Sequence, residues 1–404
     1  MKVLLVGSGG REHALAWRLA RSDGLEELHA APGNPGIAAL GDCHPVRAED
    51  GEGLLGLAGE LGIDLVVVGP EGPLVAGVAD ELRHAGIAVF GPSAAAARIE
   101  GSKSFAKDVM VAAGVPAAEA VSVARPPCVV KADGLAAGKG VFVCRTQDEL
   151  DAGLRAASAL GGQIVIEELL EGDELSVFAL CDGHTALALP AAQDFKRAFD
   201  GDQGPNTGGM GSYSPVPGWG AAEVEEALDL AHRPVLAELA ARGTPFVGVL
   251  FAGLMLTADG PRVLEFNCRF GDPETQSIVP LVEGDLLGAL WAAARGELSG
   301  ASLPAPASSA VTVVLAAGDY PATGDAGSPI EGIAEAEAAG ALVFHAGTAL
   351  RDGSVVTNGG RILGVTGVAP TLAEARDRAF AGADLISFTG MRYRSDIALE
   401  ASRG

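Results

Sequence analysis

The chain has 404 residues, of which 48% are hydrophobic and 20% are charged, and its formal net charge at pH 7 is −24. This length allows two to four domains with a large core, and the composition excludes a disordered chain. The acidic balance argues against a general nucleic-acid-binding protein, because such a protein needs a basic face.

The sequence has no segment typical of a membrane-spanning or exported protein. No apolar run approaches the roughly 20 residues of a membrane span, and residues 1–6 are too short a run for a signal peptide. We therefore expect a cytoplasmic protein that meets no membrane. The cysteines are odd in number and lack a Cys-x-x-Cys spacing, so buried free thiols are favoured over disulfides or zinc ligands. They are Cys43, Cys128, Cys144, Cys181 and Cys268.

The first hundred residues predict a doubly wound α/β unit. An apolar strand at residues 2–6 runs into the turn Gly7-Ser8-Gly9-Gly10, and a helix is predicted over residues 14–20. This order opens a helix N-terminus to a phosphate. The dinucleotide motif fails because Glu12 stands at its third glycine position, so a monophosphate or a sugar phosphate fits better than NAD. A plain tight turn would also account for these glycines.

Two further loops of this unit carry polar residues that could contact a ligand. Asn34 lies in a loop rich in Pro and Gly, and Glu71 follows the apolar strand at residues 65–68. Another strand is predicted over residues 87–90. Ligands of open α/β sheets bind at the carboxyl ends of the strands. Both side chains are therefore candidate substrate contacts, although a carboxylate at a helix start explains Glu71 equally well.

A lysine in an unfavourable position points to an anion. The helix predicted over residues 101–114 carries Lys103 in its first turn. A cation there is unfavourable against the helix dipole, which suggests that a ligand anion lies nearby. A solvated surface charge is the ordinary alternative.

Two more lysines flank a glycine-rich loop. Lys131 lies on a predicted strand, Lys139 lies in the loop 134–140, and the chain returns as a strand over residues 141–144. Glycines let backbone N–H groups approach phosphate oxygens, and lysines add point charges. This is not a Walker A loop, because it joins two strands and has glycine at position 140. A flexible hairpin would explain the glycines but not the lysines at both ends.

The next segments predict a helix, a strand, a long loop and a second helix. Thr146 begins a capping box with Glu149, and residues 163–170 read as a strand. Residues 191–217 have little helical or strand period and many glycines and prolines, as in functional or disordered loops. The amphipathic helix predicted over residues 221–241 reads as structural.

A hairpin is predicted from two apolar runs, residues 249–256 and 263–266, around an Asp-Gly turn. Its second strand places Glu265 and Asn267 on one face, and these oxygen donors suit Mg²⁺. Arg269 would share that face if the strand continued, where it could grip a carboxylate or phosphate. An edge hairpin with solvated charges is the alternative.

The remaining chain predicts a small α+β domain after a linker rich in Ser, Ala and Pro at residues 297–309. Strands are expected at residues 310–316, 342–345 and 361–365, with Asn358-Gly359 as a hairpin turn. A capping box at residues 371–374 starts a last helix.

The order of these motifs resembles the ATP-grasp enzymes, and more specifically the phosphoribosylamine–glycine ligase family. The blocks GPNTGGMG (204–211) and LEFNCRFGDPETQ (264–276) are the most specific, and the resemblance covers nearly the whole chain. It implies an α/β and α+β multidomain fold with three parts. These are an N-terminal doubly wound parallel sheet (1–100), a central ATP-grasp domain (101–307) with a small lid subdomain (about 119–175), and a C-terminal α+β domain (308–404).

The resemblance also implies the ligand contacts. ATP would be held by Lys103, Lys131, Gly134, Gly138, Lys139, Gly140, Glu167, Glu168, Leu170 and Glu174. Mg²⁺, or Mn²⁺ in its place, would be ligated by Glu265 and Asn267. Substrates would meet Gly9, Gly10, Asn34, Glu71, Asn206, Thr207 and Gly208, and the catalytic groups would be Lys131, Arg269, Asp194 and Lys196. The last two suit the ammonium and carboxylate of glycine, although a surface ion pair explains them nearly as well.

The implied reaction joins glycine to 5-phosphoribosylamine at the expense of ATP, through glycyl phosphate, in de novo purine biosynthesis. The partners would be these small molecules, and we expect a monomer that binds no nucleic acid. The chain departs from the family where Phe195 replaces a histidine and where residues 118–127 lack most of a helical segment of the lid. The alternatives are another ATP-grasp carboxylate–amine ligase, a carboxylase, or a nucleotide-binding regulatory protein without turnover.

Overall fold

The N-terminal part is a five-stranded parallel sheet in the order β3-β2-β1-β4-β5. The computed structural model describes residues 1–135 and 140–403. Alternate residues of β1 face opposite sides: Leu4 packs toward α2 and α4, whereas Leu5 packs toward α1 and α11. This confirms the doubly wound arrangement. The elements are β1 (Lys2–Gly7), α1 (Gly10–Leu19), β2 (Glu27–Pro32), η1 (Ile37–Ala39), β3 (Asp42–Cys43), α2 (Gly51–Leu61), β4 (Leu65–Val68), α3 (Glu71–Ala76), α4 (Val78–His84), β5 (Ala88–Phe90) and α5 (Ala94–Gly101).

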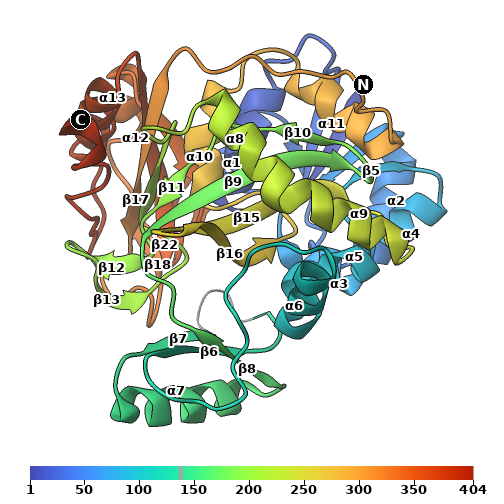
Figure 1. The fold of residues 1–404 in the computed structure, drawn as a ribbon. Coiled ribbons are helices and arrows are strands. Elements are labelled where there is room, and N and C mark those ends of the chain that lie inside the picture. The colour runs from blue at the N-terminus through green and yellow to red at the C-terminus, as the bar shows by residue number, and fades with distance from the viewer. Residues whose placement is uncertain (136–139, 404) are drawn as a thin grey trace.

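A four-stranded antiparallel sheet in the order β10-β9-β15-β16 forms the centre of the molecule (Figure 1). The predicted hairpin is its β15–β16 pair. The helix predicted over residues 221–241 is one continuous run whose middle turn is a wider π-helical turn, η2. The elements are α6 (Lys103–Ala112), β9 (Asp173–Asp182), β10 (Ala186–Ala188), α8 (Ala221–Ala227), η2 (Leu228–His232), α9 (Arg233–Ala241), β15 (Val247–Thr257), β16 (Gly260–Asn267), α10 (Glu274–Ile278), η3 (Val279–Leu281) and α11 (Leu286–Arg295).

A small sheet with one helix forms a separate layer below α6 and β16 in Figure 1. Its strand order is β7-β6-β8, and α7 packs on it around a core of its own. The predicted capping box is present: the Glu149 N–H donates to Thr146 Oγ1 at 3.3 Å, and the Thr146 N–H donates to Glu149 Oε2 at 2.9 Å. We call this layer the lid. Its elements are β6 (Cys128–Ala132), β7 (Val141–Cys144), α7 (Gln147–Leu160) and β8 (Ile164–Glu168).

The C-terminal part is built on a sheet in the order β11-β14-β17-β22-β19, covered by α13. Two of its strands come from residues 191–217, so the prediction of a strandless loop there is wrong. β14 pairs with β17, about a hundred residues away, and β11 joins the sheet by pairing with β14. A local period cannot reveal the long-range pairing. The elements are β11 (Gln193–Asp194), β12 (Arg197–Phe199), β13 (Gln203–Asn206), β14 (Gly211–Ser214), β17 (Ser309–Ala316), α12 (Ile333–Ala338), β19 (Leu342–His345), β22 (Arg361–Ala369), α13 (Leu372–Ala383) and η4 (Ala401–Arg403).

The Asn358-Gly359 hairpin turn is a second wrong prediction. The strand that ends there, β21 (Ser354–Gly359), pairs with β18 (Asp325–Pro329) and β20 (Thr348–Arg351) and not with β22. Gly359 and Gly360 instead connect this three-stranded sheet to the larger one. A Cβ on Gly359 would lie 2.9 Å from Gly347 Cα, so close approach of two backbones explains the glycine.

The cysteines are free thiols, and four of the five are buried, as their apolar neighbours predicted. In the part of the chain that the structure describes, no single helix is long and apolar enough to cross a bilayer. One bent pair, Glu274–Leu281 with Leu286–Arg295, passes on length and composition only.

Candidate active site

Strand β16 presents Glu265 and Asn267 toward the lid side of the central sheet. The register against β15 skips Leu264, which forms a β-bulge, and both donors follow the bulge two positions apart. Among the described residues, no cluster of three or more His, Cys, Asp and Glu side chains could hold a metal ion. The Glu265 carboxylate and the Asn267 amide are oxygen donors of the kind that Mg²⁺ accepts.

The Glu265 carboxylate lies among cations. Burial alone would raise its pKa, but the charges around it keep the pKa below its ordinary value. The cations are Lys196, Lys131, Lys103 and Arg269. The carboxylate is therefore ionised and able to ligate a divalent cation, while the excess positive charge suits a polyphosphate.

Lys131 and Lys107 share one buried carboxylate on β8. Each ammonium lies 2.6 Å from an oxygen of Glu167. Lys131 also donates to the carbonyl of Leu264 at the bulge, at 2.9 Å. Two lysines and one glutamate leave a net positive charge beside β16, and an anion there would neutralise it.

Lys103 is held beside the first glycine of the predicted phosphate loop. Its Nζ donates to the Gly134 carbonyl at 2.9 Å, and its backbone N–H donates to Asp133 Oδ1 at 2.6 Å. Burial lowers the pKa of this lysine. Gly138 and Lys139, two other predicted loop contacts, lie outside the described residues. Gly140 is the first residue described after them.

Four of the predicted ATP contacts lie on β8, on β9 or between them: Glu167, Glu168, Leu170 and Glu174. The Glu168 carboxylate accepts the Glu119 N–H at 2.7 Å and pairs with Arg262 at 2.6 Å. Its side chain therefore fastens the lid to the segment that precedes it. Leu170 is buried, and Glu174 is the partly buried second residue of β9.

Asp194, Lys196 and Glu174 form a charge cluster at the edge of β11. The Lys196 ammonium contacts the Glu174 carboxylate. Although burial opposes it, the charges of Asp194 and Glu174 hold the pKa of Lys196 well above its ordinary value. Burial raises the pKa of Asp194 to about 7 against the opposing effect of Lys196, and the charge of Glu274 raises it further.

Replacing Asp194 by Asn should change the pH dependence of stability. Folding raises the pKa of this carboxyl from its ordinary 3.8 to about 7. The folded state then binds more protons than the unfolded state between these values, so the group's contribution to stability is lost as pH rises through that window. We expect the melting temperature of Asp194→Asn, relative to the wild type, to be higher at about pH 7.5 than at about pH 4.5. The exposed Asp23→Asn is the control, and a pH-independent difference for Asp194→Asn would contradict the argument.

Gly9 and Gly10 lie at the N-terminus of α1, where the strand order reverses between β1 and β4. The helix begins at Gly10, earlier than predicted, because the glycine turn itself enters the first turn. Glu12 packs against this turn: it accepts the Gly9 N–H at 2.6 Å, and a Cβ on Gly69 would lie 2.0 Å from its carboxylate.

Asn34 ties this crevice to the C-terminal part. Its Nδ2 donates to the Ser8 carbonyl at 2.9 Å and to the His345 carbonyl at 2.8 Å, and its Oδ1 accepts the Ile37 N–H at 3.0 Å. The side-chain amide is thus engaged by backbone groups that hold the loop against α1.

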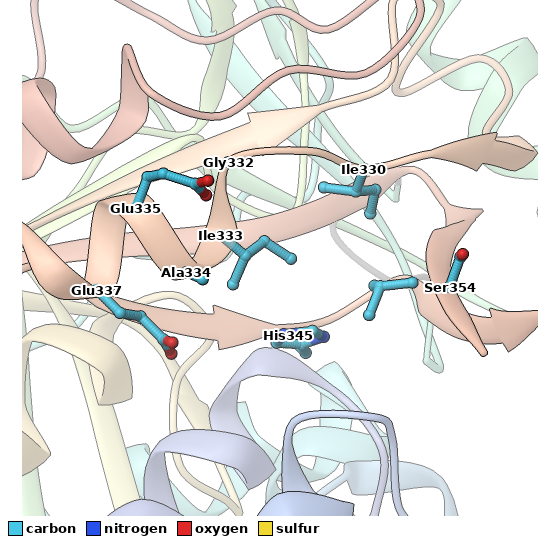
Figure 2. A pocket seen from close by; sticks show the side chains of 9 residues that line it. Ile330, Gly332, Ile333, Ala334, Glu335, Glu337, His345 and Ser354 are labelled. Atoms are coloured by element: carbon cyan, nitrogen blue, oxygen red, sulfur yellow. The ribbon is translucent and has the colours of Figure 1, made fainter.

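His345 has structural contacts. Its N–H donates to His13 Nδ1 at 2.8 Å, and its own Nδ1 lies 3.0 Å from Thr348 Oγ1. Figure 2 shows its ring at the wall of a pocket between α12 and the start of β21. None of the residues predicted to bind ATP, metal or substrate lines this pocket.

Arg269 joins two carboxylates of the N-terminal part. The strand does not continue to this residue, so the condition for Arg269 to share the face of Glu265 is not met. β16 ends at Asn267, and the next N–H is taken by the Glu100 carboxylate and not by β15. The guanidinium lies 3.3 Å from Glu71 through Nε and 3.2 Å from Glu100 through Nη2. Burial opposes it, but the charges of Glu100 and Glu71 raise the pKa of Arg269, so the side chain stays charged.

The predicted substrate loop with Asn206, Thr207 and Gly208 is fixed against Lys196. Thr207 donates to the Lys196 carbonyl from both its N–H, at 2.8 Å, and its Oγ1, at 2.9 Å. Phe195, in the place of the family histidine, lies under the Arg394 guanidinium, whose carbon is 5.0 Å from the ring centroid. That ring packs beneath the C-terminal segment.

Comparisons with known proteins agree with this architecture. Family models of phosphoribosylglycinamide synthetase match the N domain over residues 1–100, the ATP-grasp domain over 101–275 and the C domain over 310–400. The chain belongs to the phosphoribosylglycinamide synthetase family. A relative in Brucella melitensis, named phosphoribosylamine–glycine ligase, is 50% identical over 99% of this chain and 98% of its own length.

Solved structures place the family within the ATP-grasp fold. The crystal structure of phosphoribosylamine–glycine ligase from Thermotoga maritima has a TM-score of 0.85 and 36% identity, and the match covers 98% of this chain and 100% of that one. The biotin carboxylase domain of a Hydrogenobacter thermophilus 2-oxoglutarate carboxylase has a TM-score of 0.71 at 20% identity, covering 97% and 91%. The second likeness shows the fold alone. Phosphoribosylglycinamide synthetases of this ATP-grasp type use ATP and a divalent metal.

Four charged residues of the site escaped the sequence analysis. Two of them lie on helices at positions that look solvent-exposed in sequence, and the others lie in turns: Glu100, Lys107, Asp133 and Asp272. The Asp-Pro pair of the GDPE turn was the one local signal for Asp272. The others gain partners more than 25 residues away, which no local pattern could reveal.

Proposed function

We propose that this chain ligates glycine to 5-phosphoribosylamine with ATP, giving glycinamide ribonucleotide, ADP and phosphate in de novo purine biosynthesis. The observation that carries the proposal is the 50% identity, over nearly its full length, to proteins named phosphoribosylamine–glycine ligase. A carboxylase would share the fold, but the likeness to carboxylases is limited to about 20% identity. The cluster of cations around Glu265 also supports a reaction whose substrates are anions.

We assign the nucleotide to the space between the lid and β16. Lys103 and Lys131 supply positive charge for the phosphates, beside the loop that begins at Gly134. Glu265 and Asn267 are the donor pair for Mg²⁺, or Mn²⁺ in its place. When bound, such a cation neutralises phosphate charge and polarises the phosphoryl oxygens.

The protein's own groups position the two reacting pairs. Lys196 and Arg269 orient the glycine carboxylate while Asp194 pairs with its ammonium. An oxygen of that carboxylate attacks the γ-phosphorus, the bond from phosphorus to the bridging oxygen breaks, and ADP leaves. The amine nitrogen then attacks the acyl carbon of glycyl phosphate, phosphate leaves with the C–O electron pair, and the nitrogen loses one proton. Positioning and charge carry this catalysis, because no protein nucleophile is needed.

The acceptor is assigned to the crevice at the carboxyl ends of β1 and β4. The N-terminus of α1 at Gly9 and Gly10 suits a ribose phosphate, and Glu71 lies at the edge of the crevice beside Arg269. We further propose a cytoplasmic monomer whose partners are these small molecules and not nucleic acid or membrane. The five free thiols and the net charge of −24 support this assignment.

A coupled assay of ADP release tests the proposal. We expect ADP release that requires Mg²⁺, glycine and freshly made phosphoribosylamine together, and that falls to background when any one is omitted. Bicarbonate in place of glycine should give no ADP. Release that needs bicarbonate, or tight ATP binding with no ADP under any of these conditions, would refute the ligase assignment.

A further inference from the structure

Two side chains of the C-terminal part hold the backbone of the substrate loop. The Tyr320 hydroxyl accepts the Gly208 N–H at 2.9 Å. Arg361 donates from Nη1 to the Gly208 carbonyl, and to the Asp272 carbonyl at 2.7 Å. Its Nη2 lies 3.3 Å from the Asp272 carboxylate. Both backbone groups of one loop glycine are therefore bound by residues 112 and 153 positions away in sequence.

Glycines make this approach possible. A Cβ on Gly208 would lie 3.2 Å from both Arg361 Cζ and Tyr320 Oη, and a Cβ on Gly360 would lie 2.4 Å from the Tyr320 ring. Arg392 in turn donates to the Tyr320 carbonyl and fixes the turn that carries the ring. The segment at residues 359–361 thus brings Arg361 to the loop, and Gly360 leaves room for the tyrosine.

We call the side chains of Tyr320 and Arg361 the clamp. Hydrogen bonds connect this clamp to the charge cluster at the edge of β11. The Gly209 N–H donates to Thr207 Oγ1 at 3.0 Å, and Thr207 donates twice to the Lys196 carbonyl. The Lys196 ammonium then reaches Glu174. Because each link before the Lys196 side chain engages a backbone group of the loop or of Lys196, the position of Lys196 depends on where the loop is held.

We infer that Tyr320 and Arg361 are positioning residues for the glycine subsite, acting through Gly208 and Thr207 on Lys196. The inference rests on the proposed function, in which Lys196 orients the glycine carboxylate. Lys103 and Lys131, which face the nucleotide, lie on α6 and β6 outside this chain of contacts. Loosening the clamp therefore weakens glycine binding more than ATP binding, because among the predicted ATP contacts named above this chain reaches only Glu174, through the Lys196 ammonium.

The test replaces only the tyrosine hydroxyl. In Tyr320→Phe, the KM for glycine should rise about two- to tenfold, the size expected for one lost hydrogen bond, while the KM for ATP stays within about twofold. Gly208→Ala, which pushes the same clamp away, should raise the KM for glycine in the same direction. Tyr393→Phe is the matched control, because its hydroxyl contacts Asp384. Melting temperatures establish that each variant is folded under the assay conditions.

The outcomes separate the inference from the proposed function. An unchanged KM for glycine in both Tyr320→Phe and Gly208→Ala overturns the inference, and so does an equal rise in the KM for glycine and for ATP. A rise for glycine alone, absent in Tyr393→Phe, supports it. If the wild type itself shows no glycine-dependent ADP release, the proposed function fails before the variants are compared.

Discussion

Ligation by Glu265→Gln should fall by about three orders of magnitude at a Mg²⁺ concentration that saturates the wild type. The substitution keeps the shape of the side chain but removes the one carboxylate of the metal donor pair on β16. It also leaves the surrounding cations without the anion that they share, which raises the positive potential where the metal would bind. The readout is the initial rate of ADP release as a function of Mg²⁺ concentration.

Glu283→Gln is the matched control for this prediction, because that carboxylate is exposed at the start of the turn before α11. The control should show the wild-type rate and the wild-type Mg²⁺ dependence. A Glu265→Gln enzyme with both quantities unchanged would show that this carboxylate does not ligate the metal. A rate restored by about tenfold more Mg²⁺ would instead agree with weakened ligation, since the amide can still coordinate.

The fold was predictable where the sequence has a clear run of apolar residues and a local turn or capping motif. The strand at residues 65–68, the capped helix α7 and the β15–β16 hairpin each followed from apolar runs, a capping box or an Asp-Gly turn. The short strands β11 and β14 did not, because β14 pairs with β17, about a hundred residues away, and β11 joins the sheet through β14. The Asn-Gly at residues 358–359 misled for a related reason: its glycine serves a close approach of two backbones and not a two-residue turn.

The site was predictable in its residue types but not in its pairings. Spacing alone placed Glu265 and Asn267 two apart on a strand, and glycines around Lys131 suggested a phosphate loop. Spacing could not show that Glu167 is shared between two lysines, because Lys107 lies 60 positions earlier on another element. Strand alternation also does not explain the orientation of Arg269, because β16 ends at Asn267. The Glu71 and Glu100 carboxylates of the N-terminal part orient this side chain instead.

Replacing Arg269 by Lys should lower kcat/KM for glycine about 100-fold or more, although the charge is kept. The guanidinium lies between two carboxylates, Glu71 at 3.3 Å and Glu100 at 3.2 Å, and donates to the Phe270 carbonyl at 3.1 Å. A lysine ammonium is a single point on a flexible stem, so it cannot span both carboxylates. One of the two carboxylates, Glu71 or Glu100, would then lose its cationic partner. The exposed pair Arg295–Glu297 supplies the control, Arg295→Lys, which should keep the wild-type value.

A second substitution distinguishes lost positioning from a stranded charge. If Arg269→Lys harms the enzyme by leaving Glu71 unpaired, then Glu71→Gln in the same background should recover melting temperature, because a buried charge without a partner is costly. Activity should not recover with it, since the fork that orients the substrate carboxylate is still missing. Recovery of both would show that Arg269 serves stability alone. A wild-type kcat/KM in Arg269→Lys would remove the guanidinium from the mechanism, because its one distinguishing property is the planar fork.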